Sequence, residues 1–514
     1  MKSKSICVAL LTLFAAAAVS AAPLKIGWAM NDISTDQPVR LAGTFHQRIS
    51  KGLRDPLCAT ALAIDNGEDC VVFLSMDLIH SPEYVVTTVR KLVKEAIPDF
   101  KAEKILFNGT HTHTGPVLYP QKNKKLNEIT LKYREYVCKQ AAKSVIEAWN
   151  SRQPGKIAYG YDLVVTAFNR RIVYFTRQKG SPGGAPAGCA KLHGKTDTPD
   201  FSHVEGGADP FVNYLFTYDM EGKLTGAIMN VPYTAQVSIK DVHLSSDTWS
   251  DMRRLMAEKH PGIFILPQVA AAGEATFEQP YYKAAEQRRY RLIYGRDEAY
   301  PGEFQRKQIA GRLLTSFERA RAWAEKEQFA DLPIRHLTKK LMLSRYVPSD
   351  EECEQAKRDL EEIKRRREKL SEIKDPNLRK RRETSLNSSE GRCHRVLRRA
   401  EECKTQPKLP MEFHALRIGD VGFVSEQYEY YFEFGQRIAA RSPFIQTFVI
   451  EMSAIVDGGT TGYLATERAT RNGGYGVGPL SCPLSPQGGQ EIVEAAIASL
   501  NELKNGKAEP APAK

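Results

Sequence analysis

The sequence predicts a mixed α/β (α+β) fold, in which one large domain with mixed sheets is flanked by helices and carries a helical-hairpin insertion. Three observations lead to this prediction. Apolar runs rich in β-branched residues alternate with segments of helical periodicity from Lys25 to about Asp297. Strand patterns return after Glu412, and a highly charged helical segment separates the two parts. The 514 residues are enough for a sizeable core.

The first part of the domain, residues 22–301, alternates strand and helix patterns. DCVVFLSMDLI at 69–79 is apolar enough for a buried strand, and KILFNGT at 104–110 has a similar pattern. Two strands around the turn DMEGK are expected within 211–231. Because these later strands look antiparallel, the sheet is not expected to be purely parallel. The other expectations are helices over 83–97 and 132–149 and a long loop over 179–209.

Residues 302–410 form the predicted charged helical insertion. EECEQAKRDLEEIKRRREKL is dense in charge, and its apolar residues recur at steps of three and four. A second helical run follows after KDPN and NSSEG, so we expect an antiparallel helical hairpin. Cys353 near the start of the first arm and Cys403 near the end of the second suggest a disulfide. A solvated insertion without chemistry of its own is the simplest interpretation.

The two ends of the chain carry processing and tail signals. Residues 1–21 combine two lysines, an apolar run and small residues, which is the pattern of a secretory signal peptide. We therefore expect a secreted or periplasmic protein. No later segment is long and apolar enough for a transmembrane span. Residues 411–503 continue the main domain, and the low-complexity residues 504–514 are expected to be a disordered tail.

Charge and cysteine content argue against two classes of function. The formal net charge is +12, but basic and acidic residues are interleaved, and export argues against a nucleic-acid partner. No CxxC pair occurs, so a zinc site built from thiolates is not expected. Of the nine cysteines, Cys7 lies in the predicted signal, which leaves an even number that permits disulfides in an exported protein.

KILFNGTHTHTGP places two histidines, His111 and His113, directly after a strand pattern. Side chains two positions apart on an extended strand point to the same face, so both imidazoles would project together. Imidazole nitrogen is a common zinc ligand, and a hydrolytic zinc site keeps one position open for water. From these residues alone, two polar histidines in a loop explain the motif equally well.

The wider set of motifs discriminates further. THTHTGP is the most specific of them. The others occur in the order KIGWAMNDIS, DPLCATALAID, FNRR, DPFVNYLFTYDMEGKLTGAIMNV, AAAGEATF, LRIGDVGFVSEQYEYYFEFGQRI and GYLATERATRNGGYG. In this order the chain resembles the catalytic domain of the neutral/alkaline (non-lysosomal) ceramidases, and more closely their shorter bacterial relatives of unassigned substrate. The resemblance spans most of residues 24–500 outside the helical insertion.

The resemblance implies a zinc site. His111, the first histidine of the motif, would be a ligand. Glu429, six residues before Gly435, matches a family glutamate ligand, although Gln427 and Tyr428 stand where the family has Pro-Gly. The family also has a tyrosine ligand, which Tyr463 would provide here. Such a ligand is possible because the charge of a metal lowers the pKa of an oxygen acid. Alternatively, Glu429 is an exposed glutamate at the start of a helix, and Tyr463 is a partly buried aromatic residue in a glycine-rich loop.

The resemblance also implies catalytic roles. His113 would lie beside the scissile amide as a proton donor or orienting group. Tyr475, twelve residues after Tyr463, would polarise the amide carbonyl and stabilise its oxyanion. Arg170 of FNRR would hold an oxygen of the substrate. The alternatives are a partly buried aromatic residue for Tyr475 and a surface arginine for Arg170.

Two positions depart from the family pattern. Thr234 stands where the family has a second zinc histidine, and threonine is a poor zinc ligand; His243, nine residues later, would substitute if the loop folds back. In GEATF, Glu274 takes the place of the family's aspartate and Thr276 that of its catalytic serine. Thr276 keeps a hydroxyl that donates and accepts, although a structural turn hydroxyl is an equal alternative.

We therefore expect an exported zinc-dependent amidohydrolase that cleaves a linear amide with metal-activated water. The amide would belong to a ceramide-like lipid or to an amino sugar of the cell envelope, and contact with a membrane surface is compatible with this role. Two alternatives stay open. One is a non-catalytic relative that binds a glycan, a lipid or a protein partner. The other is a different enzyme on the same scaffold, with His243 or water completing the metal shell.

Overall fold

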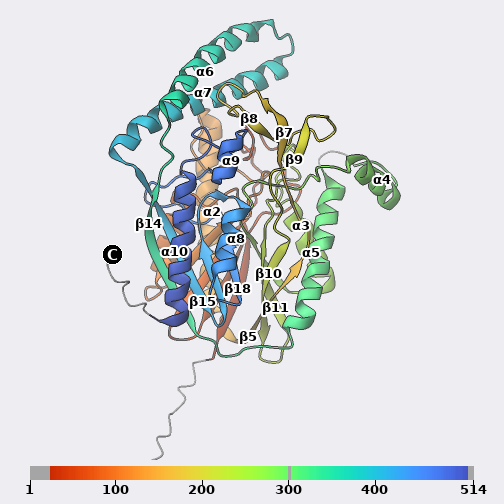
Figure 1. The fold of residues 1–514 in the computed structure, drawn as a ribbon. Coiled ribbons are helices and arrows are strands. Elements are labelled where there is room, and N and C mark those ends of the chain that lie inside the picture. The colour runs from red at the N-terminus through yellow and green to blue at the C-terminus, as the bar shows by residue number, and fades with distance from the viewer. Residues whose placement is uncertain (1–22, 299–301, 507–514) are drawn as a thin grey trace, which may run out of the picture.

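The computed structural model describes residues 23–298 and 302–506. Its centre is a pair of β-sheets with helices over their outer faces (Figure 1). The predicted mixed α/β fold class is confirmed. The predicted signal peptide lies outside the described residues, as do residues 507–514 of the predicted tail. The last described helix extends to Asn505, so residue 504, where the tail was expected to begin, is helical.

The larger sheet is mixed. In the described part of the chain its strand order is β12-β11-β10-β5-β1-β2-β3-β4, with β3–β4 and β11–β12 parallel and the other pairs antiparallel. Strands β3, β4, β10 and β11 confirm the strand predictions. The bounds are β1 (Lys25–Asp32), β2 (Cys58–Asp65), β3 (Cys70–Met76), β4 (Ile105–Gly109), β5 (Gln153–Leu163), β10 (Phe211–Asp219), β11 (Leu224–Val231) and β12 (Phe264–Val269).

The smaller sheet has the order β14-β15-β16-β18. β14 pairs with β15 in antiparallel register along its whole length, and β16 and β18 are parallel. The first strand lies in the segment that was expected to be the helical insertion. Its sequence IRHLTKKLMLS has no regular alternation of polar and apolar residues, and it forms a half-exposed edge. The bounds are β14 (Ile334–Ser344), β15 (Lys408–Ile418), β16 (Val421–Ser425) and β18 (Gln446–Ile450).

The two sheets pack face to face through a fully apolar core. Side chains such as Phe73 and Leu266 of the larger sheet meet Phe423 and Phe448 of the smaller one. The ring centroids of Phe73 and Phe423 are 5.3 Å apart. Strands buried on both faces read as continuous apolar runs, which explains why the pattern at 69–79 was recognisable from the sequence.

Helices cover the outer face of each sheet. α1 and α2 pack on the β1–β3 half of the larger sheet, α3 and α5 on its β5 and β10 half, and α8 and α10 on the smaller sheet. The helix predicted over 83–97 is confirmed as α1, and the one over 132–149 as part of α2. The bounds are α1 (Glu83–Ala96), α2 (Lys124–Asn150), α3 (Thr248–Lys259), α4 (Lys283–Tyr294), α5 (Glu303–Ala324), α8 (Phe432–Arg441), α9 (Glu467–Asn472) and α10 (Pro486–Asn505).

Short strands line one end of the molecule. β7 pairs with β8 and β9, so the segment 179–209 contains two short strands in addition to the loop expected from its glycines and prolines. Two further pairs, β6–β13 and β17–β19, connect segments far apart in the sequence. The bounds are β6 (Phe168–Asn169), β7 (Arg171–Gln178), β8 (Gly188–Leu192), β9 (Phe201–Val204), β13 (Ala275–Thr276), β17 (Glu429–Tyr430) and β19 (Tyr463–Leu464).

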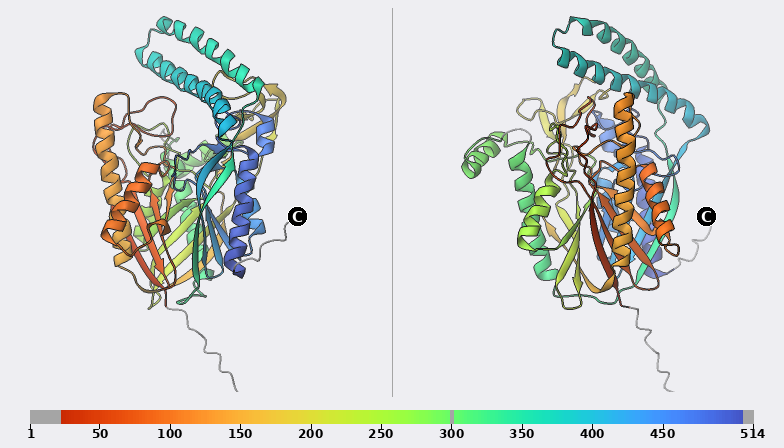
Figure 2. Two further views of the ribbon diagram at one scale, coloured as in Figure 1. Left: turned by 90° about the vertical axis from the view of Figure 1, so that its left-hand side faces the viewer. Right: turned by 180° about the vertical axis from the view of Figure 1, so that it is seen from behind.

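The helical hairpin extends over this same end, beside β7–β9 and α9 (Figures 1 and 2). It consists of α6 (Asp350–Glu368) and α7 (Pro376–Thr405), whose apolar faces meet around Ala356, Ile363 and Val396. The structure therefore limits the hairpin to the second half of the segment 302–410. The first half supplies α5 and β14, which belong to the main core.

The predicted Cys353–Cys403 disulfide is wrong. All eight cysteines of the described residues are unpaired. The reason is that α7 has 30 residues and α6 has 19, so the end of α7 passes beyond the start of α6. Cys403 contacts the carbonyl oxygen of Tyr346, which precedes α6. Across residues 23–298 and 302–506, none of the helices combines the length and apolar character that a bilayer span requires.

Candidate active site

The candidate site lies where the carboxyl ends of four strands meet. Because β3–β4, β11–β12 and β16–β18 are parallel pairs, the segments that follow β4, β12, β16 and β18 leave the two sheets close together. Backbone hydrogen bonds join them: Gly109 donates to Met452 (3.1 Å), and Glu451 donates to Val269 (2.9 Å). Loops at such strand ends are common positions for functional residues.

His111 follows β4 in a left-handed backbone conformation, with φ 58°. The segment is therefore not extended at this residue, contrary to the sequence-based expectation. Such a φ is uncommon for a residue with a side chain and often marks a functional site. Nδ1 of His111 donates to the Ile79 carbonyl oxygen (2.9 Å), which leaves Nε2 as a lone-pair donor, 4.0 Å from Oε2 of Glu429. Metal-binding histidines are typically oriented in this way.

His113 lies against His111, with ring centroids 4.8 Å apart. Its backbone N–H donates to Ala235 (3.1 Å). Neither ring nitrogen has a hydrogen-bond partner among the described residues. Gly43, at φ +83°, supports the ring from the other side: a Cβ there would come within 2.2 Å of Nδ1. Two loops therefore fix the His113 ring, and the Gly43 backbone lies close enough to favour its protonated form against the effect of burial.

Glu429 and Tyr463 are direct neighbours across the parallel pair β17–β19. The turn after β12 packs beneath them, since Gly273 donates to Tyr430 (2.9 Å) and a Cβ on Gly273 would lie 2.2 Å from the Glu429 carbonyl oxygen. The buried carboxylate of Glu451 accepts from the backbone of Tyr430 (3.0 Å) and of Ala272 (3.1 Å). These contacts hold the two candidate ligands in register.

Arg170 connects the tyrosine to this turn. One of its guanidinium nitrogens, Nη2, donates to the Tyr463 hydroxyl (3.2 Å) and to the Gly273 carbonyl (2.8 Å). Nε of Arg170 is buried and has no partner among the described residues. The residue follows β6, which pairs with β13 so that Phe168 lies opposite Thr276. The structure therefore places Arg170 inside the site, not on the surface.

Tyr475 packs edge-on against Tyr463, with ring centroids 5.6 Å apart. Its backbone is held by Arg171, whose Nη1 donates to the Tyr475 carbonyl (3.2 Å). The Arg171 guanidinium also donates to the carbonyls of Ala469 and Gly473 and forms a fully buried ion pair with Glu205. Arg171 is thus a positioning residue for the loop that carries Tyr475.

Burial dominates the electrostatics of the site. It raises the pKa of Glu429 to about 7, against the opposing effects of Arg170 and a hydrogen bond from Tyr463. Burial lowers the pKa of His111 to about 4, and that of His113 well below its usual value. The pKa of Tyr463 is raised well above its usual range by burial and by Glu429. A divalent cation among these groups would instead favour the anionic form of Glu429.

His243 is not part of this group. Its side chain is 44% exposed, and Nδ1 pairs with Oδ1 of Asp241 at 3.0 Å. The loop folds toward Lys51 and Gly52, because Lys51 donates to Val242 (2.8 Å) and Leu244 donates to Gly52 (2.9 Å). Within the described residues His243 therefore makes no contact with His111 or Glu429, and it does not complete a metal shell with them.

The two threonine positions differ in how they are engaged. Thr234 is buried beside the His113 backbone, and its hydroxyl has no partner in the described part of the chain. Thr276 is also buried, but its hydroxyl accepts from the Glu278 backbone (3.1 Å). That bond is a turn contact, and it leaves the Thr276 hydroxyl hydrogen free to donate elsewhere.

The residues present fit a zinc ion with three protein donors. Among the described residues no three His, Cys, Asp or Glu side chains form a group that could hold a metal. His111 and Glu429 would supply two donors, and the Tyr463 hydroxyl would supply a third. Imidazole nitrogen and carboxylate oxygen suit zinc. The unpartnered polar atoms of His113, Arg170 and Thr234 around this group would be costly to bury without a ligand, which fits a site that receives one.

Sequence reasoning missed several residues that build the site. Arg171 and Gly43 are two of them. Glu451 is a third. Glu274 was named only as a replacement for the family's aspartate; in the structure its carboxyl group accepts from the Phe432 backbone (3.0 Å) at the first turn of α8, and burial raises its pKa to about 8. The doubled arginine of FNRR was the only local signal for Arg171. For Gly43 and Glu451 the sequence carries no signal, because their partners are remote in the chain.

Comparison with known proteins identifies the fold. The crystal structure of neutral ceramidase from Pseudomonas aeruginosa matches with a TM-score of 0.62 and 15% identity, covering 96% of this chain and 76% of that one. A ceramidase complexed with C2 matches with a TM-score of 0.64 and 14% identity, covering 96% and 77%. No protein-family model matches the sequence. No curated protein matches it at a significant level. The chain therefore has the neutral ceramidase fold, as the motifs predicted.

Proposed function

We propose that this chain, which has the fold of the neutral ceramidases, is an exported zinc-dependent hydrolase that cleaves an amide bond of a lipid or another N-acyl amine. One observation carries the proposal. His111, Glu429 and Tyr463 converge with Arg170 and Tyr475 at the strand ends, although they come from segments that are remote from one another in the sequence. Chance burial of two histidines in a loop does not explain that convergence.

The ligands of the proposed zinc are His111 through Nε2, Glu429 and Tyr463. When bound, the metal would supply Lewis acidity and lower the pKa of water at the open position. The chain's own contribution is orientation. The Ile79 carbonyl fixes the His111 tautomer, and the β17–β19 register fixes Glu429 beside Tyr463. Thr234, in place of a fourth protein ligand, leaves more room for water or substrate.

The remaining polar groups suit the reacting amide. Tyr475 and Arg170 lie on the Tyr463 side, where their donors would hold the carbonyl oxygen and the charge that develops on it. His113 lies next to His111 with both ring nitrogens buried, and we assign it the proton transfer to the leaving amine. Thr276 is assigned a supporting role: it shapes the turn that holds Arg170 and positions water or substrate.

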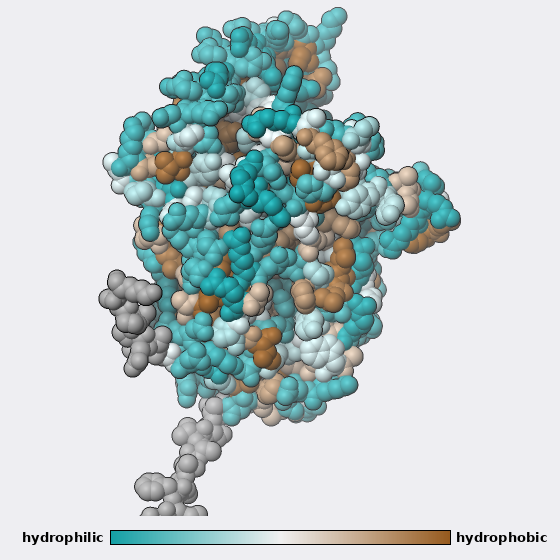
Figure 3. All heavy atoms as spheres, in the orientation of Figure 1, coloured by the Kyte–Doolittle hydropathy of each residue, from teal (hydrophilic) through white to brown (hydrophobic). Residues whose placement is uncertain are grey.

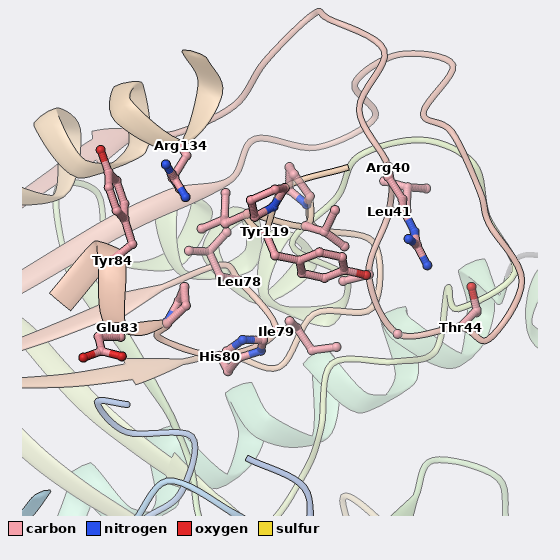
Figure 4. Close-up of a pocket in the computed structure, with 17 residues that line it drawn as sticks. Arg40, Leu41, Thr44, Leu78, Ile79, His80, Glu83, Tyr84, Tyr119 and Arg134 are labelled. Atoms are coloured by element: carbon pink, nitrogen blue, oxygen red, sulfur yellow. The ribbon is translucent and has the colours of Figure 1, made fainter. Parts of the chain in front are cut away.

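An apolar cavity beside the histidines suits the hydrocarbon part of such a substrate. Its volume is about 440 Å³, and its lining is mainly apolar, including Leu41, Leu78 and Val117 (Figure 4). Two residues connect it to the site: Ile79 accepts the His111 hydrogen bond, and Gly43 supports His113. A lipid amide is therefore favoured over an amino-sugar amide, and the approach of such a substrate is compatible with membrane-surface contact.

A non-catalytic binding role is the second candidate. The Thr276 hydroxyl is already engaged by the Glu278 backbone, and Thr234 replaces a histidine of the family pattern. Both changes are expected in a relative that binds a lipid, a glycan or a protein without cleaving it. The apolar cavity would serve such a role equally well.

Amine release from a short-chain N-acyl sphingoid base separates the two candidates. The purified protein is assayed with zinc and after chelation. Hydrolysis that disappears on chelation and returns with zinc supports the hydrolase. His111→Ala is expected to abolish it, whereas the matched variant His243→Ala is expected to retain it. Stoichiometric binding of the amide without any turnover would contradict hydrolysis and leave the binding role.

A further inference from the structure

The hairpin forms the roof of a second cavity that opens onto Tyr475. This cavity has a volume of about 450 Å³ and lies between α6, α7 and the loop 181–185. It reaches the candidate site through aromatic contacts. Phe45 packs edge-on against Tyr475, with ring centroids 5.6 Å apart, and the Arg392 guanidinium lies 4.7 Å from the centre of the Phe45 ring. The cavity is thus bounded by Tyr475, one of the two residues assigned to the amide carbonyl.

The charge of this cavity is strongly one-sided. Four cationic side chains line it, and no Asp or Glu is found among its described lining residues. These cations are Arg366, Lys369, Arg382 and Arg392. Lys369 and Arg382 form no ion pair or hydrogen bond within the described part of the chain, and Arg366 pairs only with Glu362 on its own helix. Some other hairpin cations are paired with acids, as in Arg367–Glu390 and Lys357–Glu354. Lys364 and Lys380, which do not line the cavity, form no ion pair within the described part of the chain and are exposed.

The hairpin is fixed in this position by buried contacts. Arg392 donates to the Gly183 carbonyl, and the Gly183 backbone donates to Asp359 of α6 (2.7 Å). Gly183 has φ +55°, and a Cβ there would lie 2.4 Å from a backbone oxygen of Ser389. Arg399 donates to the Pro479 carbonyl (2.8 Å), on the loop that follows Tyr475. The cations are therefore held over the site by a docked element, although the outer surface of the hairpin is largely hydrophilic (Figure 3).

We infer that this cavity is a substrate subsite that binds an anionic group, such as a phosphate, carried by the amide that the candidate site takes. The inference rests on the proposed function for the position of the amide. Its chemistry is independent of that function: arginine and lysine are the usual binders of phosphate and carboxylate, and the exposed side chains of Arg366, Lys369 and Arg382 are within reach of an anion that enters from solvent. Apolar walls from Ile363 and Leu370 suit the chain that links the anion to the amide.

Calorimetric titration with two matched probes tests the subsite. The probes are N-acetyl-sphingosine 1-phosphate and N-acetyl-sphingosine, added to the full chain after metal removal so that no turnover occurs. We expect the phosphate form to bind about 10- to 100-fold more tightly, as for other charge-assisted hydrogen bonds. The triple variant Arg366→Ala, Lys369→Ala, Arg382→Ala is expected to lose this preference. Equal affinities in the wild type, or no binding of either probe, would overturn the inference.

A matched variant removes the same charge from the outside of the hairpin. Lys364→Ala, Lys380→Ala and Arg398→Ala replace exposed cations that do not line the cavity, and the phosphate preference should remain. A second titration uses inorganic phosphate as a competitor of the phosphorylated amide. If it competes as strongly as the phosphorylated amide, the cavity takes free phosphate and the assignment as a substrate subsite is overturned.

The same probes distinguish failure of the inference from failure of the proposed function. A retained phosphate preference without amide hydrolysis on adding zinc supports the subsite and contradicts the hydrolase. Hydrolysis of both probes at equal rates by the wild type and the triple variant contradicts the subsite and supports the hydrolase.

Discussion

Glycine at position 43 shows how a single residue shapes the candidate site. Its φ of +83° is in the left-handed region, and its missing side chain makes space for the His113 ring. Gly43→Ala is expected to displace His113, and a misplacement near 1 Å lowers a rate about 100-fold. Amide hydrolysis should fall by that order while zinc content stays unchanged. The measurement is kcat/KM together with metal analysis.

Gly222→Ala is the matched control for Gly43→Ala. Gly222 has φ +86°, and the nearest atom to an added Cβ is 3.9 Å away. In both variants an alanine in the left-handed conformation lowers the free energy of unfolding by about 1–2 kcal/mol. Only the alanine at position 43 places its Cβ against the His113 ring. If the two lose activity equally, the effect is one of stability and the role assigned to Gly43 is wrong.

Arg171 and Glu205 form the most buried ion pair near the site, with side chains 0% and 3% exposed. Arg171→Met leaves Glu205 buried without its partner, which typically lowers the free energy of unfolding by about 3–5 kcal/mol. The double variant Arg171→Met, Glu205→Met is expected to recover part of that loss. Urea denaturation measures both. A loss below about 1 kcal/mol in the single variant would contradict this account of the pair.

Glu412 gives the structure a defined acid sensitivity. Burial alone would raise its pKa, but hydrogen bonds from His414 and from Arg90 lower it to about 2. Because the folded pKa lies below the ordinary value of 4.5, the stabilisation is complete above pH 4.5 and is lost as pH falls toward 2. Unfolding free energies measured between pH 6 and pH 3 should converge for the wild type and Glu412→Gln. Parallel curves would show that Glu412 does not titrate in this way.

Among the elements, the hairpin is the one that the rest of the fold least requires. Its two ends meet, since Arg345 donates to Pro407 (3.0 Å) and Ser344 is opposite Lys408 in the β14–β15 register. Replacing residues 349–405 by a short Asn-Gly turn would therefore convert β14 and β15 into an ordinary β-hairpin. We expect the variant to fold and to keep its zinc, but to lose the preference for the phosphorylated amide. Circular dichroism, metal analysis and the titration above check this, and loss of zinc would contradict it.

The elements differ in how well their sequences predict them. β3, β4, β10 and β11 are buried on both faces or bounded by clear turns, so their apolar runs predicted them. β14 lies at a sheet edge and lacks a regular alternation of polar and apolar residues, so that, within a segment dominated by helical patterns, nothing marked it as a strand. β6, β13, β17 and β19 have two residues each and exist only through pairing with distant segments. No local pattern predicts such elements.

The residues of the candidate site likewise differ in how far the sequence predicts them. The motif THTHTGP and the tyrosine spacing indicated His111, Tyr463 and Tyr475, because both match the pattern of the family that the chain resembles. Arg171 contacts the Tyr475 carbonyl across 304 residues, a relation that only the folded chain reveals. His243 was expected to fold back toward the metal, but backbone pairing with residues 51 and 52 directs it elsewhere.

For the whole molecule, the two packed sheets determine where chemistry is possible. Their parallel strand pairs bring four chain segments to one end, and the hairpin covers that end with cations. The apolar cavity includes Gly43, which supports His113, and the cationic cavity includes Tyr475. The substrate that we propose, an amide with an apolar chain and an anionic group, draws on both cavities.

Zinc content per chain is the most direct test of the central claim, that His111, Glu429 and Tyr463 form a metal site. Mass spectrometry of the purified, dialysed protein should find close to one zinc per chain. The variant His243→Ala should contain the same amount. His111→Ala should lower zinc affinity by at least about 10- to 100-fold, the scale of losses around metal shells. Absence of zinc from the wild type, or full zinc occupancy in His111→Ala, would contradict the account.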